Sequence, residues 1–323
     1  MEGKTTRDLM KVLQEKHGIH IQEDKQQALL NMGYFHGFKG YRFIKESDNR
    51  IQYSNFDEVI AIYQFDKKVK TIFYPYIMQI ETALKNITLD TIIGLASADF
   101  AYVFENLLND YKKHTPGDKD FKKKMKNRLE LRNIIYNTIS YNYRMNQSII
   151  QHFIHKNKPV PLWAIFEVIS LGDFGFFIHC LNEEARVNIA KSLSIYSESH
   201  DQKVRVLEDM IFLIKDFRNA VAHDGVVFDC RFQLTPPPNR CIQFLQSETA
   251  IDNITFEVII DYVILHIYLM NKIDSPQKDI QRLIRTFTVA SERLRKKLPA
   301  SIYSSIMGKD VSNKMMSLKR LVT

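Results

Sequence analysis

The segment from Asp201 to His223 constrains the fold most strongly, because its apolar residues recur at helical spacing. Three- and four-residue steps place these residues on one face of a helix: Val204, Leu207, Met210, Ile211, Ile214 and Phe217. Ser199 and Gln202 have the spacing of a capping box at the start of this helix. The chain has only 11 Gly and 9 Pro in 323 residues, which is few for a β-rich fold with many turns. The sequence therefore predicts an all-α protein in which this helix is largely buried.

The end of this helix carries three polar side chains that can do chemistry. Asn219 and His223 are four residues apart and share one face. Arg218 lies roughly 140° from His223 around an ideal helix, so the two side chains can flank a common cleft without touching. The alternative is a helix end at which Arg218 and His223 bind the last carbonyl groups, favoured by the helix dipole.

The charge of the chain indicates what it binds. A net charge of +8 and a pI near 9.1 favour a polyanionic partner, with nucleic acid first and an anionic membrane second. There is neither a run of eighteen apolar residues nor a signal-peptide core at the start. An odd number of cysteines without a C-x-x-C pair suits a reducing cytosol: Cys180, Cys230 and Cys241. We expect a cytoplasmic protein without a metal or other cofactor.

The first third of the chain predicts helices around an aromatic segment. Residues 6–32 are expected to form two short helices separated by Gly18. Residues 31–43 combine three Gly with five aromatics, which indicates either a platform on which bases stack or an aromatic plug between helices. Asn55 to Leu95 is expected to form two packed helices divided at Pro75. Glu81 lies on an apolar face there and requires a basic partner from elsewhere in the chain.

The second half predicts further apolar helices. We expect one helix from Leu162 to Leu181, another from Glu183 to Leu193, and a third from Ile251 to Ile273 with Asp252 or Asn253 near its N-cap. Gly225 fits the end of the helix that carries His223. Three consecutive prolines at 236–238 exclude a helix at that point.

Two strongly basic regions are candidate phosphate-binding surfaces. Residues 111–128 contain eight Lys or Arg against two Asp, and residues 275–323 contain eleven against three acids. Each region is either a solvated face or an RNA-binding surface, and residues 278–297 alternatively form an amphipathic helix on an anionic membrane. The candidate RNA-binding residues are Lys112, Lys113, Lys122, Lys123, Lys124, Lys126, Arg128, Arg293, Arg295, Lys296 and Lys297.

The motif at the end of the 201–223 helix resembles a known signature. Arg218-Asn219-Ala220-Val221-Ala222-His223 is similar to the R-x(4–6)-H motif of HEPN domains, including the polar residue that often follows the Arg. Three further elements in the same order resemble the Abi family of bacterial abortive-infection proteins, the AbiD/AbiF-like group. They are Gly33-Tyr34 with Gly40-Tyr41, residues 63–86 and residues 161–177. The chain departs from this family pattern after His223, where Asp224 and Gly225 replace the usual His or Asn and aromatic residue.

The resemblance implies a HEPN-type helical bundle with ribonuclease activity in phage defence. It divides the chain into an N-terminal helical lobe (1–105), a HEPN core (106–274) and a basic helical C-terminal extension (275–323). RNA cleaves when its 2′-OH attacks the adjacent phosphate. His223 has the ordinary pKa for either proton transfer, and Arg218 offers donors to the phosphorane oxygens. Asn219 is expected to orient the His or the phosphate.

One Arg/His pair supplies only half of an acid–base set, so a homodimer that brings two copies of His223 to one cleft is expected. The alternative function is a non-catalytic RNA-binding module that holds a structured noncoding RNA. That RNA would be the partner or the antitoxin of the protein.

Overall fold

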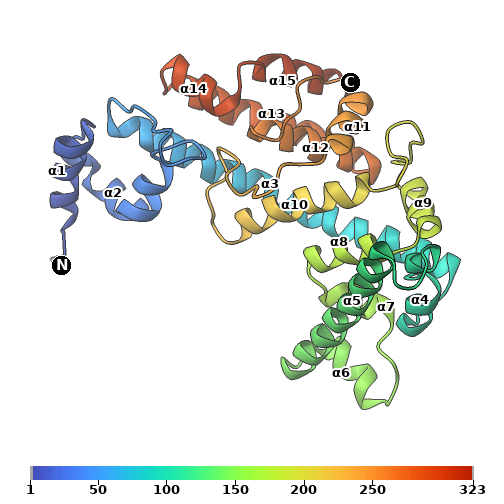
Figure 1. The fold of residues 1–323 in the computed structure, drawn as a ribbon. Coiled ribbons are helices and arrows are strands. Elements are labelled where there is room, and N and C mark those ends of the chain that lie inside the picture. Colours follow the sequence, from blue (N-terminus) through green and yellow to red (C-terminus); the bar gives the residue numbers. More distant parts are fainter. Residues whose placement is uncertain (1–2, 322–323) are drawn as a thin grey trace. The chain divides into compact units, whose positions relative to one another are not determined.

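The computed structural model describes residues 3–321, and regular secondary structure in this range is helical (Figure 1). Two isolated β-bridges, His20–Asn55 and Phe43–Arg50, occur within it without forming a strand. The prediction of an all-α protein is confirmed. The helices are α1 (Thr6–His17), α2 (Gln26–Met32), α3 (Phe56–Leu95), α4 (Phe100–Asn106), α5 (Lys119–Arg144), α6 (Ser148–His155), α7 (Leu162–Val168), α8 (Leu171–Cys180), α9 (Glu183–Ser192), α10 (Val206–Ala222), α11 (Asn239–Thr249), α12 (Ile259–Lys272), α13 (Gln277–Arg295), α14 (Ala300–Met307) and α15 (Val311–Arg320).

Two compact units interleave along the chain. The first unit contains the residues up to Ile77, then 216–237 and 245–323, and the second contains 78–215 and 238–244. Helices α3, α10 and α11 each contribute to both units, so three of the four boundaries fall inside helices and the fourth falls just before α11. They do not coincide with the predicted segments 1–105, 106–274 and 275–323, and that division into domains stays a prediction.

Helix α3 runs through Pro75 without a break, so the prediction of two packed helices is wrong. A proline inside a helix lacks one N–H and costs about 3 kcal/mol. Phe73 and Ile77, on either side of Pro75, are fully buried, and such burial offsets a cost of this size. Between residues 3 and 321 no single helix is long and apolar enough to cross a membrane. Helix α3 and the segment Phe100–Lys113, which form a bent pair, reach the required length and apolar composition only when they are taken together.

Two other predicted helices begin or end differently in the structure. The helix expected from Leu162 to Leu181 is divided at Ser170, whose hydroxyl caps α8 by accepting from the Asp173 amide at 3.1 Å. Helix α12 begins at Ile259, well after Asp252 and Asn253, so neither residue is its N-cap. The preceding segment instead binds the buried Asp261 carboxylate, which accepts from the backbone amides of Thr255 and Phe256. A side chain inside the helix therefore holds the chain that leads into it.

Helices of the first unit pack around α12, which is buried along nearly its whole length. The apolar face of α13 packs into the same unit through Ile280, Leu283, Phe287 and Leu294. The basic C-terminal region is therefore folded into the unit rather than a solvated extension. The face that insertion into a membrane would need is occupied by this packing.

The second unit contains the basic helix α5, which packs against α6, α7 and α8. Glu81 does meet a basic residue, but that residue comes from the same helix and not from elsewhere in the chain as expected. Lys85, one turn later on α3, donates to Glu81 at 3.0 Å and to the Ile169 carbonyl at 2.8 Å. This lysine therefore joins α3 to the break between α7 and α8.

His266 on α12 should make the stability of the protein depend on pH. Its ring lies between Phe73 and Phe217, and complete burial lowers its pKa from 6.5 to about 4. The unfolded chain gains a proton below pH 6.5 and the folded chain does not. The free energy of unfolding is therefore expected to fall by up to about 3 kcal/mol from pH 6.5 to 4. Urea unfolding at several pH values measures this dependence. The His266→Leu variant should lack this fall in the free energy of unfolding between pH 6.5 and 4, whereas His20→Leu, at an exposed site, should retain it.

Candidate functional site

Helix α10 begins at Val206 rather than near Asp201, and the predicted Ser199–Gln202 capping box is not its start. The Asp201 carboxylate accepts instead from the backbone amides of Arg205 and Val206, each at 2.8 Å. A buried carboxylate satisfies two free N–H groups and complements the positive end of the helix dipole. This cap fixes where the helix that carries the candidate site begins.

Removal of this cap should destabilise the protein measurably. We expect Asp201→Ala to lower the free energy of unfolding by about 1–2 kcal/mol, the usual cost of losing an N-cap side chain. Ser199→Ala, at an exposed position two residues earlier, should leave it unchanged. Urea denaturation of both variants distinguishes the two capping assignments, and equal losses would contradict the cap described above.

The far end of α10 presents the three predicted active-site side chains together. Asn219 and His223 are exposed, and Arg218 is half-buried. Arg218 donates from Nη1 to Asn219 Oδ1 at 3.2 Å, so Asn219 orients the guanidinium. The His223 amide donates to the Asn219 carbonyl at 3.0 Å, which makes His223 the residue immediately after the last helical turn. The structure thus places a cation, an amide and an imidazole at one helix end.

Asp224 turns the chain sharply away from α10. Its φ of 55° is in the left-handed region, which Asp tolerates better than most residues. The Gly225 amide then donates to the Ala220 carbonyl at 2.7 Å, the bond that closes a Schellman motif. A Cβ at position 225 would lie 3.3 Å from that carbonyl oxygen. Gly225 therefore fits the helix end, as predicted, because of this close approach, and the left-handed residue is Asp224.

Asp224 is held by a lysine of α3. Lys70 Nζ lies 2.6 Å from Asp224 Oδ1 and 2.9 Å from Asp66 Oδ2. Burial alone would lower the pKa of Lys70, but Asp66 and Asp224 raise it above the ordinary value. His36 Nε2 lies 3.3 Å from the second oxygen of Asp224. The turn beside His223 therefore has a fixed position relative to α3 and to the 31–43 segment.

Asp66 is the buried centre of this arrangement. Its carboxylate is fully buried and accepts from the amides of Val227 and Phe228 at 2.7 and 2.8 Å. The Tyr41 hydroxyl donates to it at 2.9 Å, and the Tyr41 ring stacks on Phe228. Three segments that are distant in sequence thus meet at one carboxylate.

The aromatic segment has two parts with different surroundings. Phe38 and Tyr41 are buried, as the plug interpretation expects, whereas Phe35 is 80% exposed. Residues Gly33–Phe38 form a π-helical turn, a form that is often found at functional sites. This turn presents His36 to Asp224, a contact that the sequence did not indicate.

The basic residues predicted in the 111–128 region lie in the second unit. Three of them pair with carboxylates: Lys113 with Glu183, Lys124 with Asp110 and Arg128 with Glu105. The exposed remainder is available to phosphates and consists of Lys112, Lys122, Lys123 and Lys126. The region is therefore partly a structural ion-pair network and partly a free basic surface.

The basic residues predicted at the end of α13 and just after it lie in the first unit, which also contains the Arg218 motif. Arg293, Lys296 and Lys297 line a hollow of about 740 Å³ together with Lys68 and Arg285. Arg295 is outside this hollow and pairs with Glu292 at 2.9 Å. The positive charge of the hollow's lining suits a nucleic-acid backbone.

In the described part of the chain, no group of three or more His, Cys, Asp and Glu side chains is placed to hold a metal ion. The polar groups that surround the α10 end are amide, imidazole, guanidinium and paired carboxylates. These groups can transfer protons and stabilise negative charge without a metal.

Sequence reasoning missed Lys70, His36 and the role of Asp224. The one available signal was the spacing of Asp66 and Lys70, which are four residues apart on a helix and so able to pair. His36 and Asp224 are far apart in sequence, and their contact follows only from the fold.

Comparison with known proteins identifies a family. The family model described as Abi-like protein matches residues 27–229, which includes the whole α10 site and excludes α12 to α15. Neither the curated proteins nor the solved structures contain a significant match. Because the family model covers more than half of the sequence, the chain belongs to the Abi-like protein family.

Proposed function

We propose that this protein is an abortive-infection ribonuclease of the HEPN type, with its active site at the end of α10. Membership in the Abi-like family suggests a role in phage defence. The observation that carries the proposal is the display of Arg218, Asn219 and His223 beside a turn that Lys70 and Asp66 hold in place. Exposed reactive groups on a rigid support are the arrangement that catalysis requires.

The proposed reaction uses the RNA's own 2′-OH as nucleophile. One imidazole removes the 2′-OH proton and one protonated group returns a proton to the departing 5′-oxygen. The Arg218 guanidinium stabilises the phosphorane oxygens. The Asn219 side-chain oxygen accepts a hydrogen bond from Arg218. We therefore assign Asn219 the role of orienting the Arg218 guanidinium and not the His223 imidazole.

A second acid–base group has two possible sources. In a two-fold homodimer the partner subunit supplies it through its own copy of the α10 motif. Within one chain, His36 is the nearest candidate on contacts, because it pairs with Asp224, the residue next to His223. The homodimer remains our proposal. Loss of cleavage on dilution below the dimer dissociation constant supports it, and full activity of a monomer favours His36.

A non-catalytic RNA-binding module is the competing function. The hollow lined by Arg293, Lys296 and Lys297 supports it, because such a surface binds a structured noncoding RNA without cutting it. Both functions predict binding that weakens steeply with salt. Retained RNA binding with lost toxicity in a His223→Ala variant favours the enzyme.

The direct test is cleavage of labelled RNA by the double variant Arg218→Ala with His223→Ala. Both residues lie at the surface end of α10, so the variant should remain folded. Its cleavage should fall to background. Cleavage as fast as that of the parent chain would refute the assignment of the active site.

A further inference from the structure

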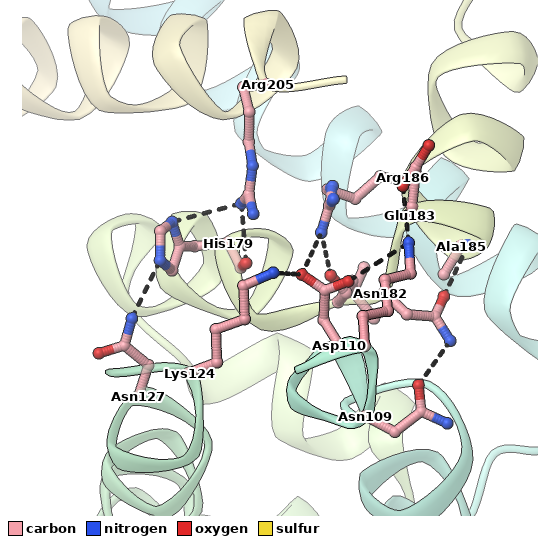
Figure 2. A network of polar contacts seen from close by, with 12 residues as sticks. Asn109, Asp110, Lys124, Asn127, His179, Asn182, Glu183, Ala185, Arg186 and Arg205 are labelled. Carbon is pink, nitrogen blue, oxygen red and sulfur yellow. Dashed lines mark hydrogen bonds and ion pairs between the residues drawn. The ribbon is translucent and has the colours of Figure 1, made fainter. Parts of the chain in front are cut away.

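The second unit contains a small polar cavity that is separate from the Arg218 motif. It has a volume of about 150 Å³ and lies between α5, α8, the start of α10 and the 3-10 turn Asp110–Lys113. Figure 2 shows the polar network that forms its walls. Side chains from four separate segments converge there, among them Lys124, His179 and Arg205. The 111–128 region supplies only part of this cavity, and sequence reasoning gave no indication of His179 or Arg205.

One wall of the cavity is an imidazole held in a fixed orientation. His179 Nδ1 lies 2.8 Å from Glu208 Oε1, and Arg205 Nη1 donates to Glu208 Oε2 at 2.7 Å and to the His179 carbonyl at 2.8 Å. The Phe176 ring stacks on the imidazole. Burial alone would raise the pKa of Glu208, but His179 and Arg205 lower it. Glu208 is thus ionised and accepts a hydrogen bond from His179, which places a proton of the imidazole on Nδ1.

The other nitrogen of His179 lies at the cavity. Asn127 Nδ2 is 3.1 Å from His179 Nε2, so the amide donates to the ring when the imidazole is neutral. A ligand oxygen can take the place of His179 beside the Asn127 amide, or of Asn127 beside the imidazole. When the imidazole is protonated, Nε2 becomes a donor and Glu208 balances its charge.

The opposite wall is a carboxylate surrounded by cations (Figure 2). Asp110 lies 2.5 Å from Lys124 Nζ, 3.6 Å from Lys113 Nζ and 4.0 Å from Arg186 Nη1. Burial alone would raise the pKa of Asp110, but Lys124 and Arg186 lower it. Asp110 therefore holds Lys124 and Arg186 near this wall, whereas Lys113 is also paired with Glu183 at 2.6 Å.

Charge and size together select the ligand. The cavity is lined by Lys123, Lys124, Arg128 and Arg205 against Asp110 and Asp120. Arg128 also pairs with Glu105, Arg205 with Glu208 and Lys124 with Asp110, whereas the exposed Lys123 belongs to none of these pairs. A terminal phosphate carries about −1.5 to −2 at pH 7. Pockets for whole drug-sized ligands measure about 300–1,000 Å³, so this cavity admits a phosphate group and excludes the attached nucleoside. A terminal phosphate can enter with its single substituent outside the cavity, whereas a phosphodiester within a strand carries two substituents that must both stay outside.

We propose that this cavity is a binding site for a phosphomonoester, either the phosphorylated end of a nucleic acid or a free mononucleotide. Lys123 supplies positive charge that is outside the ion pairs of the network, and the Asn127 amide donates to a phosphate oxygen. His179 donates through Nε2 in its protonated form, whose charge Glu208 balances. Lys123 is exposed and lies beside the paired Lys124, so it can reach the ligand without breaking the network. The site is independent of the Arg218 motif, and its failure would leave the proposed ribonuclease function untouched.

The decisive variant is Asn127→Asp, which is nearly isosteric and places a negative charge against the ligand. Titration calorimetry with inorganic phosphate should show one site per chain in the wild type and at least tenfold weaker binding in the variant. Asn133→Asp makes the same charge change at an exposed position of the same helix and should bind phosphate as the wild type does. Equal loss in both variants, or no binding by the wild type, would overturn the proposal.

Two further comparisons test the charge and the source of the ligand. Lys123→Gln should weaken phosphate binding roughly fivefold, whereas the neighbouring Lys122→Gln should not. Short oligonucleotides with a 5′- or 3′-phosphate should bind more tightly than the same sequences with hydroxyl ends, and 5′-AMP shows how much a mononucleotide achieves alone. Equal binding of phosphorylated and hydroxyl ends would refute a phosphomonoester site. The His223→Ala variant should bind phosphate normally.

Discussion

Replacing His223 by alanine should lower the rate of RNA cleavage by a factor of roughly 10²–10⁴, the usual contribution of general acid–base catalysis. The side chain is exposed at the end of α10, so its loss should change the free energy of unfolding by no more than about 0.5 kcal/mol. RNA binding should persist, because Arg218 and the basic residues of α13 remain. Single-turnover cleavage of a labelled RNA measures the chemical step separately from binding.

His20→Ala is the matched control for this experiment. His20 is also an exposed histidine of the first unit, so the control removes a similar charge and area outside the motif. It should cleave RNA at the wild-type rate. If both variants retain full activity, His223 has no role in catalysis and the RNA-binding function becomes the better account.

Lys70→Met should have the largest effect on stability of any substitution near the site. The Lys70 ammonium bridges two carboxylates, that of the fully buried Asp66 and that of the exposed Asp224. The variant leaves the buried Asp66 carboxylate without its cation. Removing one partner of a buried ion pair costs about 3–5 kcal/mol. Cleavage should fall as well, because the turn at Asp224 then loses its attachment to α3. Urea unfolding and single-turnover cleavage measure the two effects.

The pH dependence gives this prediction a second signature. The pKa of Lys70 is raised in the folded chain. The free energy of unfolding that Lys70 contributes is therefore fully present below the unfolded pKa of 10.5, and it is lost as the pH rises through the higher pKa of the folded chain. The stability difference between wild type and Lys70→Met should therefore be constant from pH 7 to 9 and shrink only in stronger alkali. Lys67→Met, at an exposed position one turn earlier, should match the wild type throughout. A difference under 1 kcal/mol for Lys70→Met would contradict the bridging role.

The helical class of the fold followed from the sequence because apolar periodicity is a local property. The buried face of α10 was predicted for this reason. The 278–297 helix was predicted to be amphipathic, but that the apolar face of α13 is buried in the first unit was not. Helix boundaries were harder, since they depend on tertiary burial or on a capping side chain several residues away. Pro75 lies within α3, and the start of α10 depends on Asp201. Neither outcome can be read from the residues adjacent to the boundary.

The candidate site was predictable only in part. Arg218, Asn219 and His223 lie on one helix end, so their spacing alone placed them together. Asp224 appeared in the sequence only as a departure from the family pattern, yet it is the residue that Lys70 and His36 bind. The phosphate-sized cavity was equally hidden, because Asn127, His179 and Arg205 come from three different helices or their ends.

Sequencing the RNA that co-purifies with the protein tests the ribonuclease proposal most directly. The wild-type chain and the His223→Ala variant would be expressed with their native flanking DNA, and the bound RNA extracted and its ends mapped. Attack by the 2′-OH leaves 5′-hydroxyl ends, so we predict host RNA fragments with such ends from the wild type and their absence from the variant. A discrete, uncut RNA bound equally to both proteins would contradict the ribonuclease and identify an RNA-binding module.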